Sequence, residues 1–285
     1  MNKHRHYAGY VKRKVAFISK MFFLIFCAVV TLFPFYWVIL ASFKQSEEIY
    51  VNALGMPHDF LKYMVQNYSS AWTLTRAPIA FFNSLFYSVV SIFIVLLVSS
   101  MVSYIIARVI SNKWLLVFFS LGIMVPMQAL IIPLNIVLNN FGILNTRAGL
   151  IAAFVASNIS FSIFIISAFM RGIPHELEEA ASIDGCTRAQ TFFWIIVPIS
   201  KAALATAGTF VFINCWNDLL LSMTILQSSN LLTLNLAVYN LHGEFVTDFG
   251  EVTAGIVMLI IPAMIMYLIF QEQIIKGITS GAVKG

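Results

Sequence analysis

Uncharged stretches long enough to cross a lipid bilayer dominate this sequence. Five of them occupy residues 21–43, 77–107, 114–146, 148–170 and 252–271, and a sixth, residues 202–226, is interrupted only by Asp218. A helix that crosses the hydrocarbon core needs about 20 predominantly apolar residues. The stretches are continuous and do not alternate with a period of two, so they favour helices over a β-barrel.

The composition supports the same class of protein. The chain has 285 residues, of which 60% are hydrophobic and 10% are charged, whereas soluble domains carry about 25% charged residues. We therefore expect an all-α integral membrane protein that forms one transmembrane domain, residues 1–285. The expected six transmembrane helices cover residues 17–42, 81–107, 114–138, 148–170, 198–225 and 252–274. Pro126 and Pro133 should kink or shorten the third.

The basic residues predict the orientation of the chain. With residues 1–14 in the cytoplasm, thirteen of the seventeen Lys and Arg residues lie inside, and only Lys44, Lys62, Arg76 and Arg147 lie outside. This bias places both termini, the tail at residues 275–285 and the connection at residues 171–197 in the cytoplasm. The outer connection at residues 44–76 has room for a short surface helix. The net charge of +5 reflects this topology and does not indicate nucleic-acid binding.

The cysteines and histidines show no catalytic or metal-binding pattern. Cys27, Cys186 and Cys215 lack the spacing of a metal site and are expected to be free thiols. The five histidines lie outside the expected spans, so neither a metal site nor a membrane-embedded enzyme is predicted.

The cytoplasmic connection at residues 171–197 is unusual because it contains four of the twelve acidic residues. Pro174 suits the first turn of a helix, and Glu176, Glu178 and Glu179 then lie near the positive end of the helix dipole. Gly185 can adopt the left-handed conformation that ends such a helix after about three turns. The segment therefore predicts a short capped helix.

A second helix is expected to begin directly afterwards. Thr187 and Gln190 have the spacing of a capping box, and Pro198 follows where the chain returns to the bilayer. Ala180 and Ala181 would allow another surface to approach the backbone of the first helix closely. A solvated acidic loop is the simpler alternative, but a loop needs neither caps nor small central residues.

These residues lead to a resemblance. The pattern Glu179-Ala180-Ala181, three residues, Gly185, nine residues and Ile195-x-Val197-Pro198 resembles the EAA signature of permease subunits of ATP-binding cassette importers, with Val197 where the family has Leu. The resemblance covers roughly residues 15–285, and it is closest to six-span, maltose-transporter-type subunits of the carbohydrate-uptake branch. Weaker matching strings are Asn83-Ser84-Leu85, Pro126 with Pro133-Leu134, Leu144-Asn145-Thr146, Trp216-Asn217-Asp218 and the tail KGITSGAVKG.

The resemblance implies a transport subunit, not an enzyme, and places it in the inner membrane of a prokaryotic cell. Its expected partners are a cytosolic ATPase dimer, a second homologous permease subunit, an extracytoplasmic solute-binding protein that meets the acidic loop at about residues 227–250, and membrane lipid. The chain lacks a phosphate-binding loop of its own, so ATP and Mg²⁺ are expected on the ATPase subunits and no cofactor on this chain. The ATPase-coupling residues would be Glu179, Ala180, Ala181, Asp184, Gly185 and Pro198. The tail residues expected to contact the ATPases are Lys276, Gly277, Gly281 and Lys284.

Polar residues in the expected spans are candidates for a solute path. These are Asn158, Ser162, Asn214, Trp216, Asn217 and Asp218. Neutral amides and hydroxyls suit an uncharged sugar, but they also form hydrogen bonds between helices, and we favour that interpretation for Asn158, Ser162 and Asn214. For Asp218, helix capping or local packing is favoured over solute contact.

Two other kinds of transporter remain as alternatives. An importer subunit for a glycerol-phosphate compound would share the same signature. A secondary transporter is expected to contain paired ionisable groups at mid-membrane and repeated broken helices, which this sequence does not show.

Overall fold

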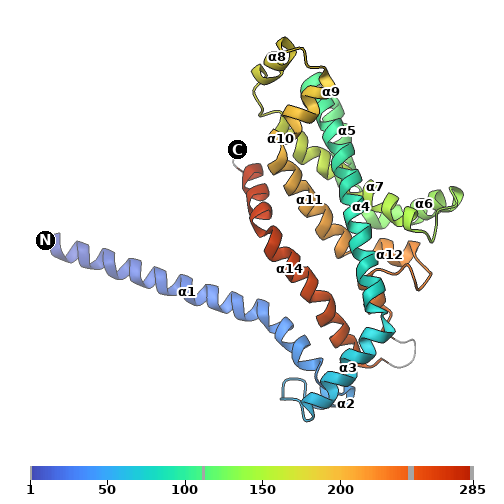
Figure 1. Ribbon diagram of the computed structural model, residues 1–285. Helices are drawn as coiled ribbons and strands as arrows, with labels where there is room; N and C mark the ends of the chain where they lie inside the picture. The colour runs from blue at the N-terminus through green and yellow to red at the C-terminus, as the bar shows by residue number, and fades with distance from the viewer. Residues whose placement is uncertain (1, 111–112, 243–246, 283–285) are drawn as a thin grey trace. The chain divides into compact units, whose positions relative to one another are not determined.

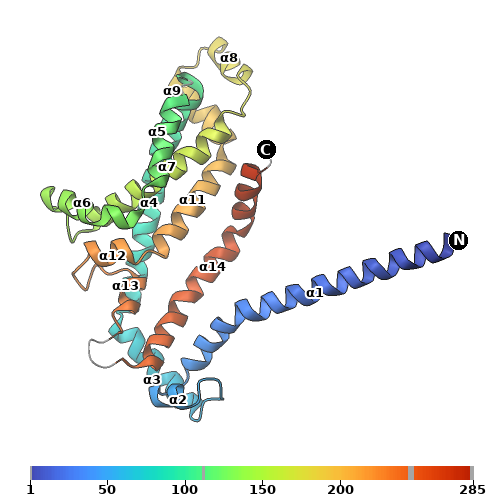
Figure 2. The same ribbon diagram turned by 180° about the vertical axis from the view of Figure 1, so that it is seen from behind.

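The computed structural model describes residues 2–110, 113–242 and 247–282, and the regular secondary structure in these ranges is helical throughout (Figures 1 and 2). The chain divides into two compact units. One comprises residues 1–74 and 241–258, and the other comprises residues 75–240 and 259–285. Each unit is described separately below.

The first unit contains α1 (Asn2–Ala41), α2 (Ser46–Val51), α3 (Phe60–Leu74) and the start of α14 (Phe249–Ala282). The connection after α1 therefore contains two helices where one was expected. Buried Asn67 donates to the carbonyl oxygens of Ser42 at 3.0 Å and Lys44 at 2.9 Å. Asp248 accepts hydrogen bonds from Ser46 Oγ and Gly250 N. Polar contacts thus join the two sequence-distant parts of this unit.

The second unit contains the remaining helices. In chain order these are α4 (Ala77–Tyr104), the π-helix η1 (Ile105–Val109), α5 (Lys113–Met124), α6 (Met127–Asn140), α7 (Arg147–Met170), α8 (Glu176–Ile183), α9 (Arg188–Thr191), the π-helix η2 (Phe192–Ile196), α10 (Val197–Ile199), α11 (Lys201–Trp216), α12 (Leu220–Ile225), α13 (Leu234–Tyr239) and the rest of α14.

Four helical segments are long and apolar enough to cross a membrane in the described part of the chain. They are Ala16–Ala41, Ala77–Val109, Arg147–Met170 and Phe249–Glu272. Two bent pairs raise the number to six if each pair is one span: Trp114–Met124 with Met127–Asn140, and Arg188–Ile199 with Lys201–Trp216. All six expected spans therefore have a counterpart, but two of them are broken.

The first break lies where a kink was expected in the third span, and the second break changes the limits of the fifth. The third bends by 96° between Met124 and Met127, at Pro126, which cannot donate a helical hydrogen bond. The fifth was expected at residues 198–225, but Pro198 lies in α10, before a bend of 75°, and α11 begins only at Lys201. At its other end α11 stops at Trp216, because Asn217 and Asp218 interrupt the helix before α12.

The core of the second unit is built by α4, α7 and α11, which pack against one another (Figure 1). Small polar residues line α4 where it meets α7, and two of them donate to carbonyl oxygens of that helix: Ser99 Oγ to Ile159 and Ser103 Oγ to Ile163. Small side chains allow membrane helices to approach closely. Gly208 of α11 serves the same purpose, since an added Cβ would lie 3.2 Å from Leu96 of α4.

Candidate functional site

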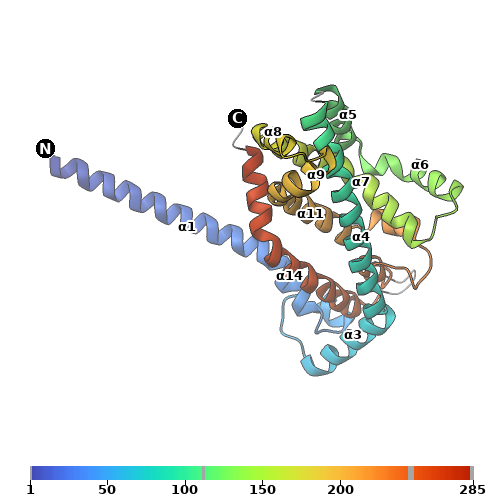
Figure 3. The same cartoon turned by 45° about the horizontal axis from the view of Figure 1, so that its top comes forward.

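The short helix expected from the acidic segment is α8, at the end of the unit that also carries η1 and α9 (Figure 3). It begins at Glu176 and not at Pro174, so it has about two turns instead of three. Glu176, Glu178 and Glu179 lie in its first turn, as expected. The acidic residues therefore face the partial positive charge of the helix N-terminus.

Gly185 ends α8 in the predicted left-handed conformation, with φ of 81°. Cys186 N donates to Ala181 O at 2.9 Å and Gly185 N donates to Ser182 O at 3.1 Å. These two bonds form a Schellman motif, in which a left-handed residue satisfies the last carbonyls of a helix. Thr187 and Gln190 then form both halves of the predicted capping box. The chain is thus held by caps on both sides of the turn.

The two central alanines of α8 face different ways. Ala180 is exposed, whereas Ala181 is only 3% exposed and packs inside this chain. Of the two alanines, only Ala180 therefore lies on the surface where a partner could approach, and its contact with a partner stays a prediction. Glu179, Asp184 and Gly185 are exposed beside it, and so is Ile183, at 86%. An isoleucine this exposed, together with half-exposed Leu177, gives α8 an apolar surface that the sequence analysis did not single out.

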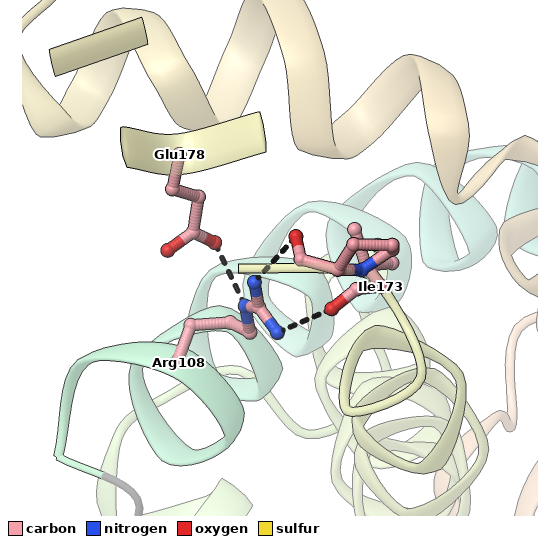
Figure 4. Close-up of polar contacts among 4 residues, drawn as sticks. Arg108, Ile173 and Glu178 are labelled. Carbon is pink, nitrogen blue, oxygen red and sulfur yellow. Dashed lines mark hydrogen bonds and ion pairs between the residues drawn. The ribbon is translucent and has the colours of Figure 1, made fainter. Parts of the chain in front are cut away.

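Arg108 binds the N-terminal end of α8 and the residues that precede it (Figure 4). Its Nε donates to Glu178 Oε1 at 2.8 Å, Nη1 donates to Ile173 O at 2.7 Å, and Nη2 donates to Pro174 O at 3.2 Å. The Arg108 side chain is 1% exposed and that of Glu178 is 19% exposed. Removing one partner from a buried ion pair leaves an uncompensated charge and costs about 3–5 kcal/mol. Sequence reasoning missed this pair because its members are 70 residues apart.

An apolar cluster surrounds the same region. Tyr104 and Ala107, from the end of α4 and η1, pack with Met170 of α7 and with Phe192 and Ile196 of η2. The rings of Tyr104 and Phe192 are 5.2 Å apart. Two π-helical segments therefore meet beneath α8, and such segments occur frequently at functional sites.

A second candidate site is an open recess of about 450 Å³. Its polar lining residues lie on α7, on α11 and in the break after α11, and apolar residues surround them. The polar residues are Ser157, Asn158, Asn214, Asn217 and Asp218, and the apolar ones are Met127, Phe154, Ile213 and Leu221. Asn214 Nδ2 donates to Asn158 Oδ1 at 2.9 Å and joins α11 to α7. This bond is the expected interhelical hydrogen bond, and it also lies at the wall of the recess.

Asp218 caps α12, as the favoured interpretation predicted. Its carboxylate accepts hydrogen bonds from Leu221 N at 3.2 Å and from Ser222 N and Oγ, both at 2.8 Å. The carboxylate is therefore occupied mainly by the chain's own donors while it lines the recess.

The other two candidates for the solute path lie elsewhere. Ser162 is fully buried and does not line the recess. Trp216 is also buried, stacks on Phe212 with ring centroids 5.6 Å apart, and lines a separate aromatic pocket of about 110 Å³ with Tyr267 and Phe270. The structure thus brings together Asn158, Asn214, Asn217 and Asp218, and it adds Ser157, which the sequence analysis did not single out.

The tail residues fall on or beyond the last helix. α14 continues to Ala282, so Lys276, Gly277 and Gly281 belong to the same helix as the last expected span. Lys284 lies outside the described residues.

Residues from two of the short sequence strings that match importer permeases bind the loop at residues 227–233. Asn83 Nδ2 donates to the carbonyl oxygens of Asn230 at 2.9 Å and Leu232 at 3.1 Å, and Tyr87 Oη donates to Leu231 O at 2.9 Å. Asn145 Oδ1 accepts hydrogen bonds from the backbone N–H groups of residues 227 and 228. Asn83 and Asn145 from these strings therefore hold a loop that is distant from them in the sequence, and the N-terminal part of α4 binds this loop.

Comparison with solved structures shows which known fold the chain shares. The fold matches a chain in the crystal structure of a bacterial ABC transporter involved in the import of the acidic polysaccharide alginate. The TM-score is 0.78 at 21% sequence identity, and the match covers 91% of this chain and 96% of that one. The chain therefore has the fold of an all-helical importer permease.

Sequence comparison gives the family. Residues 99–280 match the family described as "Binding-protein-dependent transport system inner membrane component", and the chain belongs to it. Among its relatives is a diacetylchitobiose uptake system permease protein of Streptomyces coelicolor, 32% identical over 94% of this chain and 89% of the relative. Another is a trehalose transport system permease protein of Mycobacterium tuberculosis, 33% identical over 89% of this chain and 93% of the relative.

The expected class of protein is thereby confirmed. The chain is a multi-pass bacterial inner-membrane protein and a permease subunit of a binding-protein-dependent ABC importer.

Proposed function

We propose that this subunit translocates a sugar or oligosaccharide delivered by an extracytoplasmic binding protein. Its relatives named above transport diacetylchitobiose and trehalose. The recess supports a neutral solute, because its lining carries amides and a hydroxyl among apolar side chains, and none of the lining residues is Lys or Arg. Its carboxylate, Asp218, accepts hydrogen bonds from Leu221 and Ser222. A phosphate-bearing solute would need cationic partners. A lining without cations and with one carboxylate favours a polyol over a glycerol-phosphate compound.

The force for transport comes from separate ATPase subunits that dock on α8. The observation that carries this proposal is the exposed surface of α8: Glu179, Ala180 and Ile183 are exposed, Arg108 fixes the N-terminal end of the helix, and the Schellman motif at Gly185 caps its C-terminal end. Ile183 fits an apolar cleft, Ala180 allows close approach, and Glu179 is available to pair with a basic group. ATP and Mg²⁺ are held by the ATPases, and a second homologous permease subunit completes the membrane part. The tail at residues 275–285, with Lys276, Gly277, Gly281 and Lys284, contacts the ATPases in this proposal.

Both termini and α8 lie on the cytoplasmic side in this proposal, as the distribution of basic residues favours. The native Cys186, beside α8 and half-buried, provides the test of orientation. With Cys27 and Cys215 replaced by serine, a membrane-impermeant thiol reagent is expected to label Cys186 in inside-out vesicles and not in intact spheroplasts. Labelling of intact spheroplasts would overturn the orientation.

Reconstitution tests the transport function. The chain is purified with its co-purifying subunits, placed in proteoliposomes with the binding protein, and supplied with a panel of labelled oligosaccharides and glycerol-phosphate compounds. ATP-dependent uptake of an oligosaccharide is expected. Uptake that depends on an ion gradient and not on ATP, or that is confined to phosphorylated solutes, would refute the proposal.

A further inference from the structure

We propose that Arg108 is a positioning residue that fastens α8 to α4, so that α4 carries a displacement of α8 to the loop at residues 227–233. This inference rests on the proposed docking of ATPases on α8. It concerns what happens to the motion after docking, and it assigns a role to a residue outside the EAA pattern.

The contacts of Arg108 are divided between two parts of the segment that they hold. Two donors bind the carbonyl oxygens of Ile173 and Pro174, which precede α8, and a third binds Glu178 within the first turn of the helix. One planar guanidinium therefore fixes both the approach to α8 and the helix itself. A lysine ammonium has a single donor centre and cannot reproduce this fork of three bonds.

The neighbouring acidic residues show that the pairing is specific. Glu176 and Glu179 share the first turn of α8 with Glu178, but both are exposed, whereas Glu178 is turned toward Arg108 and mostly covered. All three contribute equally to the charge near the helix N-terminus. Glu176 is therefore a matched control for Glu178, because changing it removes the same charge without breaking the contact with Arg108.

Arg108 belongs to the same continuous helical segment that holds the loop at its far end. α4 passes into η1 without a break, and the candidate span is Ala77–Val109. At the N-terminal end of α4, Asn83 and Tyr87 donate to three carbonyl oxygens of the loop, and Ser84 Oγ accepts from Leu234 N. With a rise of about 1.5 Å per residue, Asn83 and Arg108 are about 38 Å apart, more than the hydrocarbon thickness of about 30 Å.

One helix is thus bound by side-chain hydrogen bonds to α8 at one end and to the loop at the other. A well-packed helix moves as a rigid body when one end is displaced. Without Arg108, α8 would stay joined to the chain through its flanking segments and the apolar contacts of Ala181, but its direct polar link to α4 would be lost. In that case ATP hydrolysis and docking would continue, but the N-terminal end of α4 would no longer move with α8.

The test compares Arg108→Lys and Glu178→Gln with the control Glu176→Gln in the complete reconstituted complex. In each variant Cys27 and Cys186 are replaced by serine, buried Cys215 is kept, and Gln227→Cys carries an environment-sensitive fluorophore on the exposed loop. Three quantities are measured: ATPase subunits that co-purify, solute transported per ATP hydrolysed, and the fluorescence change on trapping with ATP and vanadate. Hydrogen exchange of α4 amides confirms that the fold is retained.

We expect Arg108→Lys and Glu178→Gln to keep the ATPases bound, to reduce solute transported per ATP by about tenfold, which is within the usual range of coupling between sites, and to abolish most of the fluorescence change. Glu176→Gln should behave as the unaltered chain. Normal coupling and a normal fluorescence change in Arg108→Lys would overturn the inference. If the ATPases fail to co-purify with the unaltered chain, the proposed docking is wrong instead.

A relinking experiment covers the case in which Arg108→Lys loses its fold. The double variant Arg108→Cys with Glu178→Cys is joined by a bifunctional thiol reagent of about the length of the two lost side chains. Transport per ATP should rise on crosslinking and fall when the link is cleaved. Crosslinking that forms but leaves coupling at the level of the unlinked variant contradicts a mechanical role for the contact.

Discussion

Replacing Gly185 tests whether the turn after α8 must be rigid. Gly185 has φ of 81°, and a Cβ added there would have no atom within 4 Å. The effect of a substitution is therefore conformational and not a clash with neighbours. A left-handed conformation costs an L-residue roughly 1–2 kcal/mol, and less for Asn, whose short polar side chain tolerates this region. A β-branched residue is a genuine outlier there.

The series Gly185→Asn, Gly185→Ala and Gly185→Val should therefore show graded loss of function in that order. If valine forces the residue out of the left-handed region, the two bonds made by Gly185 N and Cys186 N are also lost, and each hydrogen bond contributes about 0.5–1.5 kcal/mol. The loss of both bonds then costs about 1–3 kcal/mol, in place of the strain of a left-handed valine. In either case the turn that positions α8 is weakened.

The assay is ATP-dependent uptake by the reconstituted complex, with the amount of inserted protein and the basal ATPase activity measured alongside. Gly185→Asn should retain most of the transport, and Gly185→Val should lose it while insertion into the membrane is unchanged. Equal transport by the asparagine and valine variants would refute the reasoning, because the two differ mainly in their tolerance of positive φ.

Three further predictions follow from the described contacts. Asp218→Ala leaves the N–H groups of Leu221 and Ser222 without their acceptor, and loss of such a cap costs about 0.5–2 kcal/mol; a lower thermal midpoint of the purified complex is expected, while Asp218→Asn, which keeps an acceptor, should lie between. Asn214→Leu breaks the bond to Asn158 and makes the recess less polar, so the KM for transported sugar should rise more than for the control Thr224→Val, which does not line the recess; unchanged uptake kinetics would exclude the recess from the path. Deleting residues 277–285 should uncouple ATP hydrolysis from uptake if the tail reaches the ATPases, and an unchanged ratio of solute to ATP would rule that role out.

Local features were predictable from the sequence because their causes are local. The left-handed Gly185, the capping box of Thr187 and Gln190, and the bend near Pro126 each depend on residues within a few positions of one another. The existence of the spans follows from hydrophobic length alone. The limits of the fifth span did not follow, because a single acidic residue in the otherwise uncharged stretch at residues 202–226 does not show that Asn217 and Asp218 separate two helices.

Contacts between distant parts of the chain were not predictable from the sequence in the same way. Arg108 appears in the sequence as one of many basic residues that follow a span, and Asn83 and Asn145 appear as parts of short strings without an evident role. The fold gives each of them a partner: Arg108 binds residues 173–178, and the two asparagines bind the backbone of the loop at residues 227–233. A buried guanidinium and a buried amide, such as that of Asn83, must be paired to be tolerated. Pairing therefore contributes to where α8 and the loop lie relative to α4, and the short signature around α8 acts on the rest of this unit partly through contacts that lie outside the signature itself.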